Sequence, residues 1–168
     1  MCGIVGLFLK DKALEPELGS LLTSMLITMT DRGPDSAGIA IYGDETAGYS
    51  KMTVQSVSPE LDFAGLDSAL CDALGGTVSM EITSTHAVLS IPGGSFEKAR
   101  ETLSVLRPSV RIMSRGDTLE IYKEVGLPKD VAAQFNVTKM SGTHGIGHTR
   151  MATESAVTTM GAHPFNTG

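Results

Sequence analysis

The chain has 168 residues, a length that suits one domain or one domain carrying an insertion. Hydrophobic residues make up 41% and charged residues 19%, which is typical of a globular protein and excludes a disordered one. The formal charge is −6 without any Lys/Arg cluster, so nucleic acid and anionic membranes are not expected partners. The sequence contains no apolar run of about 18 residues, no signal-peptide pattern and only two distant cysteines, and we therefore expect a cytoplasmic protein.

The first third of the chain predicts strands around one amphipathic helix. Residues 3–9 are apolar and read as a buried strand. Leucine and methionine then recur at a spacing of three to four, which predicts a helix over 16–30. The segment 31–36 contains Gly-Pro and Asp-Ser and predicts a turn. Strands are expected at 37–42 and 47–54.

The rest of the chain alternates in the same way. In chain order we expect a helix at 59–74, a strand at 76–91, a helix at 95–106, two strands joined as a hairpin at 115–117, a helix at 128–135, and a strand within 143–152 that runs into a loop. The last stretch, 153–168, predicts no regular element. We interpret this ending as a fold cut short or completed by another chain.

A cysteine stands directly after the initiator methionine. Removal of Met1 would give Cys2 the free α-amino group, whose pKa of about 7.7–8.0 leaves a useful neutral fraction at physiological pH. One residue would then supply both the nucleophilic thiolate and the base that takes its proton. The alternative is that Cys2 is a small apolar residue at a frayed end.

Four sequence blocks follow one another along the chain. They are CGIVG from Cys2, RGPDSAG from Arg32, GHTRMAT from Gly147 and HPF from His163. Together they resemble the glutaminase domain of class II glutamine amidotransferases, over about 1–43 and 143–168. The likeness is closest to the stand-alone glutaminase subunits of glutamate-synthase-like enzymes such as N-methylglutamate synthase.

The resemblance implies a reaction and a set of site residues. The family hydrolyses L-glutamine to glutamate and ammonia through a γ-glutamyl thioester, which Cys2 would form. Arg32 would brace the active-site loop, Arg150 would hold the glutamine α-carboxylate, Thr153 would lie near that carboxylate, and His163 with its proline would shape the pocket wall. A guanidinium suits the α-carboxylate because its planar fork binds in a bidentate way that lysine cannot copy.

The sequence also departs from the family pattern. Met151 and Glu154 stand where many members have an aromatic residue and a histidine, and Glu154 adds a negative charge near a carboxylate site. The Asn-Gly pair of the oxyanion hole and the acidic residue for the substrate amino group are expected beyond the last residue, so the isolated chain is expected to be nearly inactive. Residues 55–140 read as an inserted α+β segment, for which we hypothesise docking to a synthase subunit.

Four other residues have ordinary interpretations. His144 and His148 lie four apart on a predicted strand and share a face, but no carboxylate or cysteine completes a ligand set, so strand packing is favoured over a metal site. His86 reads as core or as a partner surface, and Cys71 as a buried apolar residue in a helix.

The resemblance implies an α+β fold of the N-terminal-nucleophile hydrolase type: a four-layer αββα sandwich, incomplete at the C-terminus. The glutaminase chemistry needs no cofactor or metal, and the ammonia would pass to a partner synthase. The likeness to glutamate-synthase-like enzymes implies that this partner is a flavin and iron–sulfur protein. Two alternatives stay open. One is a non-catalytic regulatory or scaffold subunit that keeps the fold, and the other is an amidase for a different amide, which Arg150 disfavours.

Overall fold

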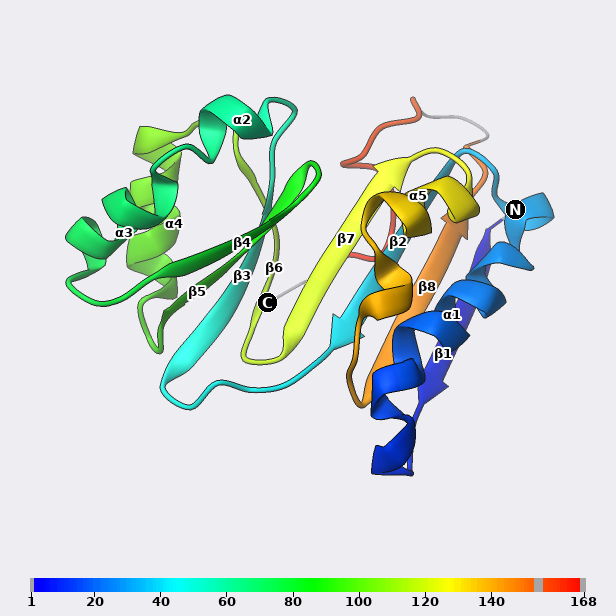
Figure 1. Ribbon diagram of the computed structural model, residues 1–168. Helices are drawn as coiled ribbons and strands as arrows, with labels where there is room; N and C mark the ends of the chain where they lie inside the picture. The colour runs from blue at the N-terminus through cyan, green and yellow to red at the C-terminus, as the bar shows by residue number, and fades with distance from the viewer. Residues whose placement is uncertain (1, 153–155, 167–168) are drawn as a thin grey trace. The chain divides into compact units, whose positions relative to one another are not determined.

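The computed structural model describes residues 2–152 and 156–166, which divide into two compact units (Figure 1). Unit 1 comprises Met1–Gly43 and Ile121–Phe165, and unit 2 comprises Asp44–Glu120 and Asn166–Gly168. The chain leaves unit 1 after β2 (Ser36–Tyr42) and returns in β7 (Leu119–Val125). Unit 2 is therefore almost wholly one continuous stretch of sequence.

Sheet A of unit 1 has the strand order β1-β8-β2-β7, with β1 at Gly3–Phe8 and β8 at His144–Arg150. β8 is antiparallel to both of its neighbours. The N–H of Gly126, just after β7, donates to the carbonyl of Asp35, just before β2, at 2.9 Å. The end of β7 thus meets the start of β2, and the last strand of the chain fills the gap between the first two.

Helices cover one face of sheet A. α1 (Leu18–Ile27) packs against β1 and β8, and α5 (Pro128–Gln134) packs against α1 and β2. Short 3₁₀ turns flank them: η1 at Lys12–Glu17, η2 at Thr30–Arg32 and η3 at Val137–Lys139. A spacing of four residues lines up Leu18, Leu22 and Leu26 on one side of α1, and all three are fully buried. Their removal from water holds α1 on the sheet.

Unit 2 has its own sheet and core. Sheet B has the order β4-β5-β3-β6, formed by Ser79–Thr83, His86–Pro92, Tyr49–Gln55 and Arg111–Gly116. Three helices belong to this unit: α2 (Pro59–Asp62), α3 (Leu66–Leu74) and α4 (Phe96–Leu106). Buried side chains from β3, β5, α3 and α4 form one cluster that includes Met52, Leu89, Leu70 and Leu103.

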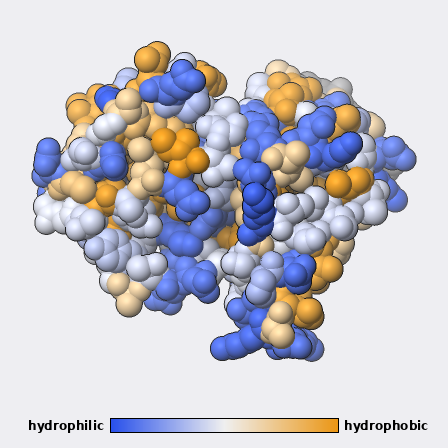
Figure 2. Space-filling model, viewed as in Figure 1, coloured by the Kyte–Doolittle hydropathy of each residue, from blue (hydrophilic) through white to orange (hydrophobic). Residues whose placement is uncertain are grey.

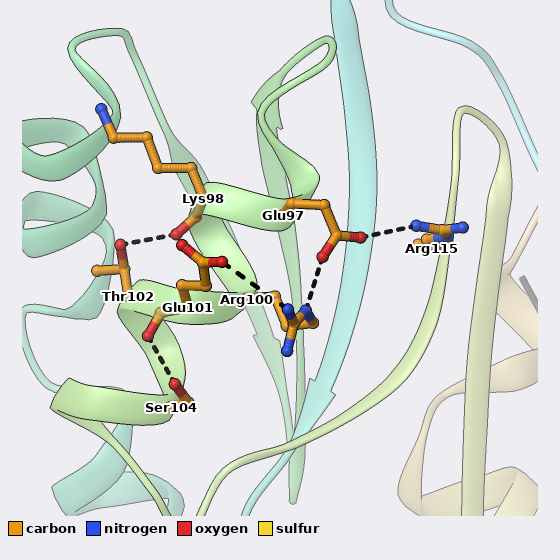
Figure 3. A network of polar contacts seen from close by, with 7 residues as sticks. All are labelled: Glu97, Lys98, Arg100, Glu101, Thr102, Ser104 and Arg115. Carbon is orange, nitrogen blue, oxygen red and sulfur yellow. Dashed lines mark hydrogen bonds and ion pairs between the residues drawn. The ribbon is translucent and has the colours of Figure 1, made fainter.

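A polar network fixes α4 beside β6 (Figure 3). The carboxylate of Glu97 accepts from Arg100 at 2.8 Å and from Arg115 of β6 at 3.3 Å. The Arg115 guanidinium also lies over the Phe96 ring, 4.6 Å from its centroid. Since these side chains are largely exposed, each ion pair contributes at most about 1 kcal/mol. The network therefore orients the start of α4 more than it stabilises the unit.

Three sequence predictions are wrong in detail. The helix expected over 59–74 is two helices, because Gly65 between them has a φ of +66° that ends the helical path. The strand expected over 76–91 is a β4–β5 hairpin that turns at Ser84, where φ is +55°. The strands on either side of 115–117 exist, but they are not a hairpin, because β6 belongs to sheet B and β7 to sheet A.

The expected α+β class with two antiparallel sheets is confirmed. The N-terminal-nucleophile type stays a prediction, and so does the insertion of 55–140, since a division by compactness at 43/44 and 120/121 does not say which segment was inserted. Within the described part of the chain, no helix has the length and apolar character needed to cross a bilayer.

Candidate functional site

The register of sheet A determines which side chains share a face with Cys2. A side chain at Gly147 would meet Leu26 of α1, so β8 residues of odd number face the helices and those of even number face away. We call the face opposite α1 the site face. Gly3 pairs with Thr149, and continuing that register by one residue places Cys2 opposite Arg150 on the site face.

Strand β2 adds a third residue to this end of the site face. Ser36 pairs with Arg150 from the side opposite β1. Ser36 is fully buried, and its hydroxyl makes no hydrogen bond within the described residues. Cys2 is exposed and Arg150 is half-buried. A thiol, a guanidinium and a hydroxyl therefore gather where β1 and β2 flank the end of β8.

The block that begins at Arg32 is hydrogen-bonded to the block that contains Arg150. The N–H of Asp35 donates to the Arg150 carbonyl at 3.1 Å, and the Asp35 carboxylate accepts from the N–H of Ala152 at 2.7 Å. A methyl group at Gly33 would lie only 2.4 Å from the Arg150 backbone nitrogen, so glycine permits this close approach. Arg32 precedes this contact at the end of η2, with its side chain exposed. The arrangement fixes the backbone from which Arg150 extends.

The block that begins at His163 packs on the site face at Gly38. A methyl group at Gly38 would be 2.1 Å from the His163 carbonyl oxygen, so the backbone of this segment occupies the place of a side chain. The rings of His148 and His163 are 4.5 Å apart between centroids. The structure thus brings the segment of His163 and the backbone that follows Arg32 to Arg150, and the β1–β8 register places Cys2 on the neighbouring strand. Thr153 and Glu154 lie outside the described residues, and their predicted roles stay predictions.

Sequence reasoning missed Lys123 of β7, which is only 2% exposed. Its Nζ donates to the Ala162 carbonyl at 2.9 Å and to the Pro164 carbonyl at 3.5 Å. It also lies 4.3 Å from the centroid of the Phe165 ring. The sequence contains a sign that Lys123 is unusual. Every second residue of β7 faces the same side, and Lys123 is the one charged residue in a row that otherwise consists of Leu119, Ile121 and Val125.

Burial lowers the pKa values of three basic groups near the site face, and neighbouring positive charges add to the effect at the two histidines. Burial lowers the pKa of Lys123 from 10.5 to about 8. Burial, followed by the charges of His163 and Arg150, lowers the pKa of His148 from 6.5 to about 4. Burial, followed by Lys123 and Arg150, also lowers the pKa of His163. At neutral pH both imidazoles are therefore mainly uncharged, whereas Lys123, with a pKa of about 8, is mainly protonated.

The histidines of β8 pack on different rings. His144 stacks on Tyr42 with centroids 4.0 Å apart, whereas His148 contacts His163. No cluster of three or more metal-ligating side chains occurs within residues 2–152 and 156–166. In unit 2, His86 is fully buried and Cys71 is half-buried, with its sulfur accepting from the Val78 N–H at 3.1 Å.

Unit 2 carries none of the predicted site residues. Its surface has a groove of about 690 Å³ between α3 and α4, lined by Ala69, Ala73 and Val105 together with the acidic Asp72 and Glu101. Figure 2 shows hydrophobic side chains at the surface near α2, the region of the exposed Val57 and Leu61. The predicted site residues that the structure describes therefore all belong to unit 1.

The chain is similar to proteins named for glutamine chemistry. The glutamine amidotransferase-like protein GlxB of Rhizobium meliloti is 64% identical over 168 residues, 100% of this chain and 56% of that protein. A provisionally named glutamine amidotransferase of Methanothermobacter thermautotrophicus is 32% identical over 178 residues, 98% of this chain and 56% of that protein. The glutamine–fructose-6-phosphate aminotransferase (isomerizing) of Methanosarcina acetivorans is 43% identical over 60 residues, 35% of this chain and 9% of that protein.

No protein-family model matches the chain. The chain spans 56% of the length of the first two relatives. The first of these relatives nevertheless aligns with all of its residues and the second with 98% of them. The comparisons therefore support a glutamine amidotransferase domain in this chain.

Proposed function

We propose that the chain is the nucleophile-bearing part of a class II glutamine amidotransferase with an N-terminal-nucleophile hydrolase fold. The observation that supports this proposal is the β1–β8 register: Gly3 pairs with Thr149, so Cys2, just before β1, is expected beside Arg150, the last residue of β8. One residue supplies a nucleophile, and the other a planar cation that fits a carboxylate.

In the proposed reaction the Cys2 thiolate attacks the γ-carboxamide carbon of glutamine. The carbon–nitrogen bond of the tetrahedral intermediate then breaks, and ammonia leaves with the proton that the Cys2 α-amine took from the thiol. Water attacks the resulting thioester and releases glutamate. Arg150 holds the α-carboxylate, and the His163 segment forms a wall of the pocket. Thr153 is proposed to bind near the same carboxylate and Arg32 to brace the loop.

The test is intact mass spectrometry of the full natural chain after exposure to 6-diazo-5-oxo-norleucine, an alkylating mimic of glutamine. We expect a protein that lacks Met1 and gains one adduct, and Cys2→Ala should gain none. Retention of Met1, or no adduct at all, would sink the catalytic proposal and leave a non-catalytic scaffold that keeps the fold.

Arg150→Lys tests the carboxylate contact separately. Lysine keeps the charge but loses the bidentate fork. The KM of the full natural chain for glutamine, measured by glutamate release, should therefore rise about 10- to 100-fold. Arg111→Lys, an exposed arginine of unit 2, is the matched control and should leave the KM unchanged. An unchanged KM in Arg150→Lys would assign the carboxylate to another group.

The partner is proposed to be a synthase subunit or domain that consumes the ammonia, since ammonia released into solvent would be lost. Transfer within a complex should make glutamine-dependent product formation resistant to an added enzymatic ammonia trap. Complete suppression by the trap would show that the ammonia passes through solvent.

A further inference from the structure

Lys123 is placed by its strand to reach the site face. Its neighbour Tyr122 contacts the ring of Phe135 at the end of α5, 5.5 Å between centroids, so Tyr122 faces the helices. Alternation along β7 turns Lys123 to the opposite face. There it lies beside Gly38, where an added methyl group would be 2.7 Å from the Lys123 Cβ. Glycine at this position leaves a notch that both Lys123 and the His163 backbone enter.

The segment that carries His163 is bound to β7 by side-chain hydrogen bonds. Within the described residues 156–166 it contains no helix or strand to support it. Lys123 Nζ donates to the carbonyls on both sides of His163, those of Ala162 and Pro164. The adjacent Glu124 accepts a short hydrogen bond from the Thr159 hydroxyl. Two successive residues of one strand thus bind this segment at Thr159, Ala162 and Pro164.

The same segment also reaches Arg150. A methyl group at Gly161 would lie 3.3 Å from Nη1 of Arg150, and this Nη1 is buried. Movement of the Ala162 carbonyl away from Lys123 would therefore loosen the packing around the guanidinium. In this way a residue of β7 affects the proposed carboxylate ligand on β8, two strands away in sheet A.

We propose that Lys123 is a positioning residue for glutamine binding: by holding the carbonyls of Ala162 and Pro164 over the site face, it fixes His163 and the surroundings of Arg150. This inference rests on the proposed function, because the pocket it shapes is the proposed glutamine pocket. Lys123 itself is not placed in contact with the reacting atoms.

The experiment compares two alkylating reagents at Cys2 of the full natural chain, by intact mass over time. 6-Diazo-5-oxo-norleucine requires a glutamine pocket, whereas iodoacetamide requires only an accessible thiol. Lys123→Met removes the donor while keeping the length of the side chain. We expect it to slow the glutamine mimic about tenfold or more and to leave the iodoacetamide rate within about twofold. Lys129→Met, an exposed lysine of α5, is the control and should change neither rate.

Two further variants separate positioning from general support of the fold. Lys123→Arg retains donors for the two carbonyls and should recover most of the rate with the glutamine mimic. Phe165→Leu removes the ring near Lys123 Nζ at a side chain that is 52% exposed, so the fold should survive, and the same rate should fall several-fold. If Lys123→Met does not fold, Phe165→Leu decides the question.

The outcomes are distinguishable. A wild-type chain that reacts with iodoacetamide but not with the glutamine mimic refutes the proposed function itself. A wild-type chain that reacts with both, together with Lys123→Met or Phe165→Leu variants that react at the wild-type rates, overturns the positioning role alone. Equal slowing of both reagents in Lys123→Met would show that Lys123 supports the fold without shaping a glutamine pocket.

Discussion

The buried imidazole of His148 should make the folded state sensitive to mild acid. His148 is 8% exposed, and its Nδ1 is buried without a hydrogen bond to any described residue. Burial first, and then the charges of His163 and Arg150, lower its pKa from 6.5 to about 4. Replacement by glutamine, His148→Gln, keeps a polar side chain of similar reach but removes the titration.

The sign and size of the effect follow from proton uptake. Between pH 6.5 and 4 the unfolded chain binds a proton at His148 that the native chain does not bind, so the free energy of unfolding decreases as the pH falls through this window. A difference of about 2.5 pKa units, at about 1.4 kcal/mol per unit, gives a loss on the order of 3 kcal/mol by pH 4. That is a large part of the stability of a domain of ordinary size.

The assay is urea unfolding of the wild type and of His148→Gln at several pH values between 4 and 7.5. Carboxylates titrate in both proteins, so the difference between the two curves isolates His148. We expect the wild type to lose stability more steeply, with the gap between the curves changing by up to about 3 kcal/mol. His163→Gln should reduce the slope only in part, because burial remains after the neighbouring charge is removed. Parallel curves for the wild type and His148→Gln would refute the reasoning that His148 is buried in its neutral form.

Three further predictions concern the same unit. Gly38→Ala should lower the free energy of unfolding by about 1–3 kcal/mol in urea titrations, because its methyl group would lie 2.1 Å from the His163 carbonyl oxygen. The control is Gly6→Ala, whose methyl group would have no neighbour within 4 Å. Replacement of 44–120 by an Asn-Gly turn should leave a unit 1 that unfolds cooperatively on heating, because β2 and β7 are neighbours in sheet A. A shortened chain without a thermal transition would contradict this prediction. The stability of the wild type should rise between pH 8 and 10.5, since the unfolded chain then keeps a proton that native Lys123 has lost, and Lys123→Met should lack this rise.

The sequence predicted the existence of the strands in sheet A better than it predicted which strands pair. Strands around Cys2, Gly38 and Arg150 were predicted because each is a compact apolar run bounded by clear turn residues. The pairing of β6 and β7 was predicted wrongly, since a turn signal at 115–117 marks a change of direction but does not say which sheet receives each strand. That choice depends on contacts distant in sequence.

The candidate site residues were predicted from the four sequence blocks. What the sequence did not predict is the contacts that connect one block to another. Asp35 was recognised as a turn former, yet its carboxylate and backbone also bind the segment that follows Arg150. Lys123 lies in a stretch without family resemblance, and only the fold brings it to Ala162 and Pro164. Composition and periodicity could indicate that Lys123 faces inward, but not what it would bind there.

The central position of β8 in sheet A has a consequence for biosynthesis. β1 and β2 flank β8 and do not pair with each other, so a growing chain cannot close this sheet until His144–Arg150 has left the ribosome. Unit 2, almost wholly continuous in sequence, is synthesised in full before then and can fold first. Throughout that interval the start of the chain has no strand partner in sheet A, so the removal of Met1 that the proposed function requires could occur before the sheet closes. Cys2 would come beside Arg150 only when β8 pairs with β1.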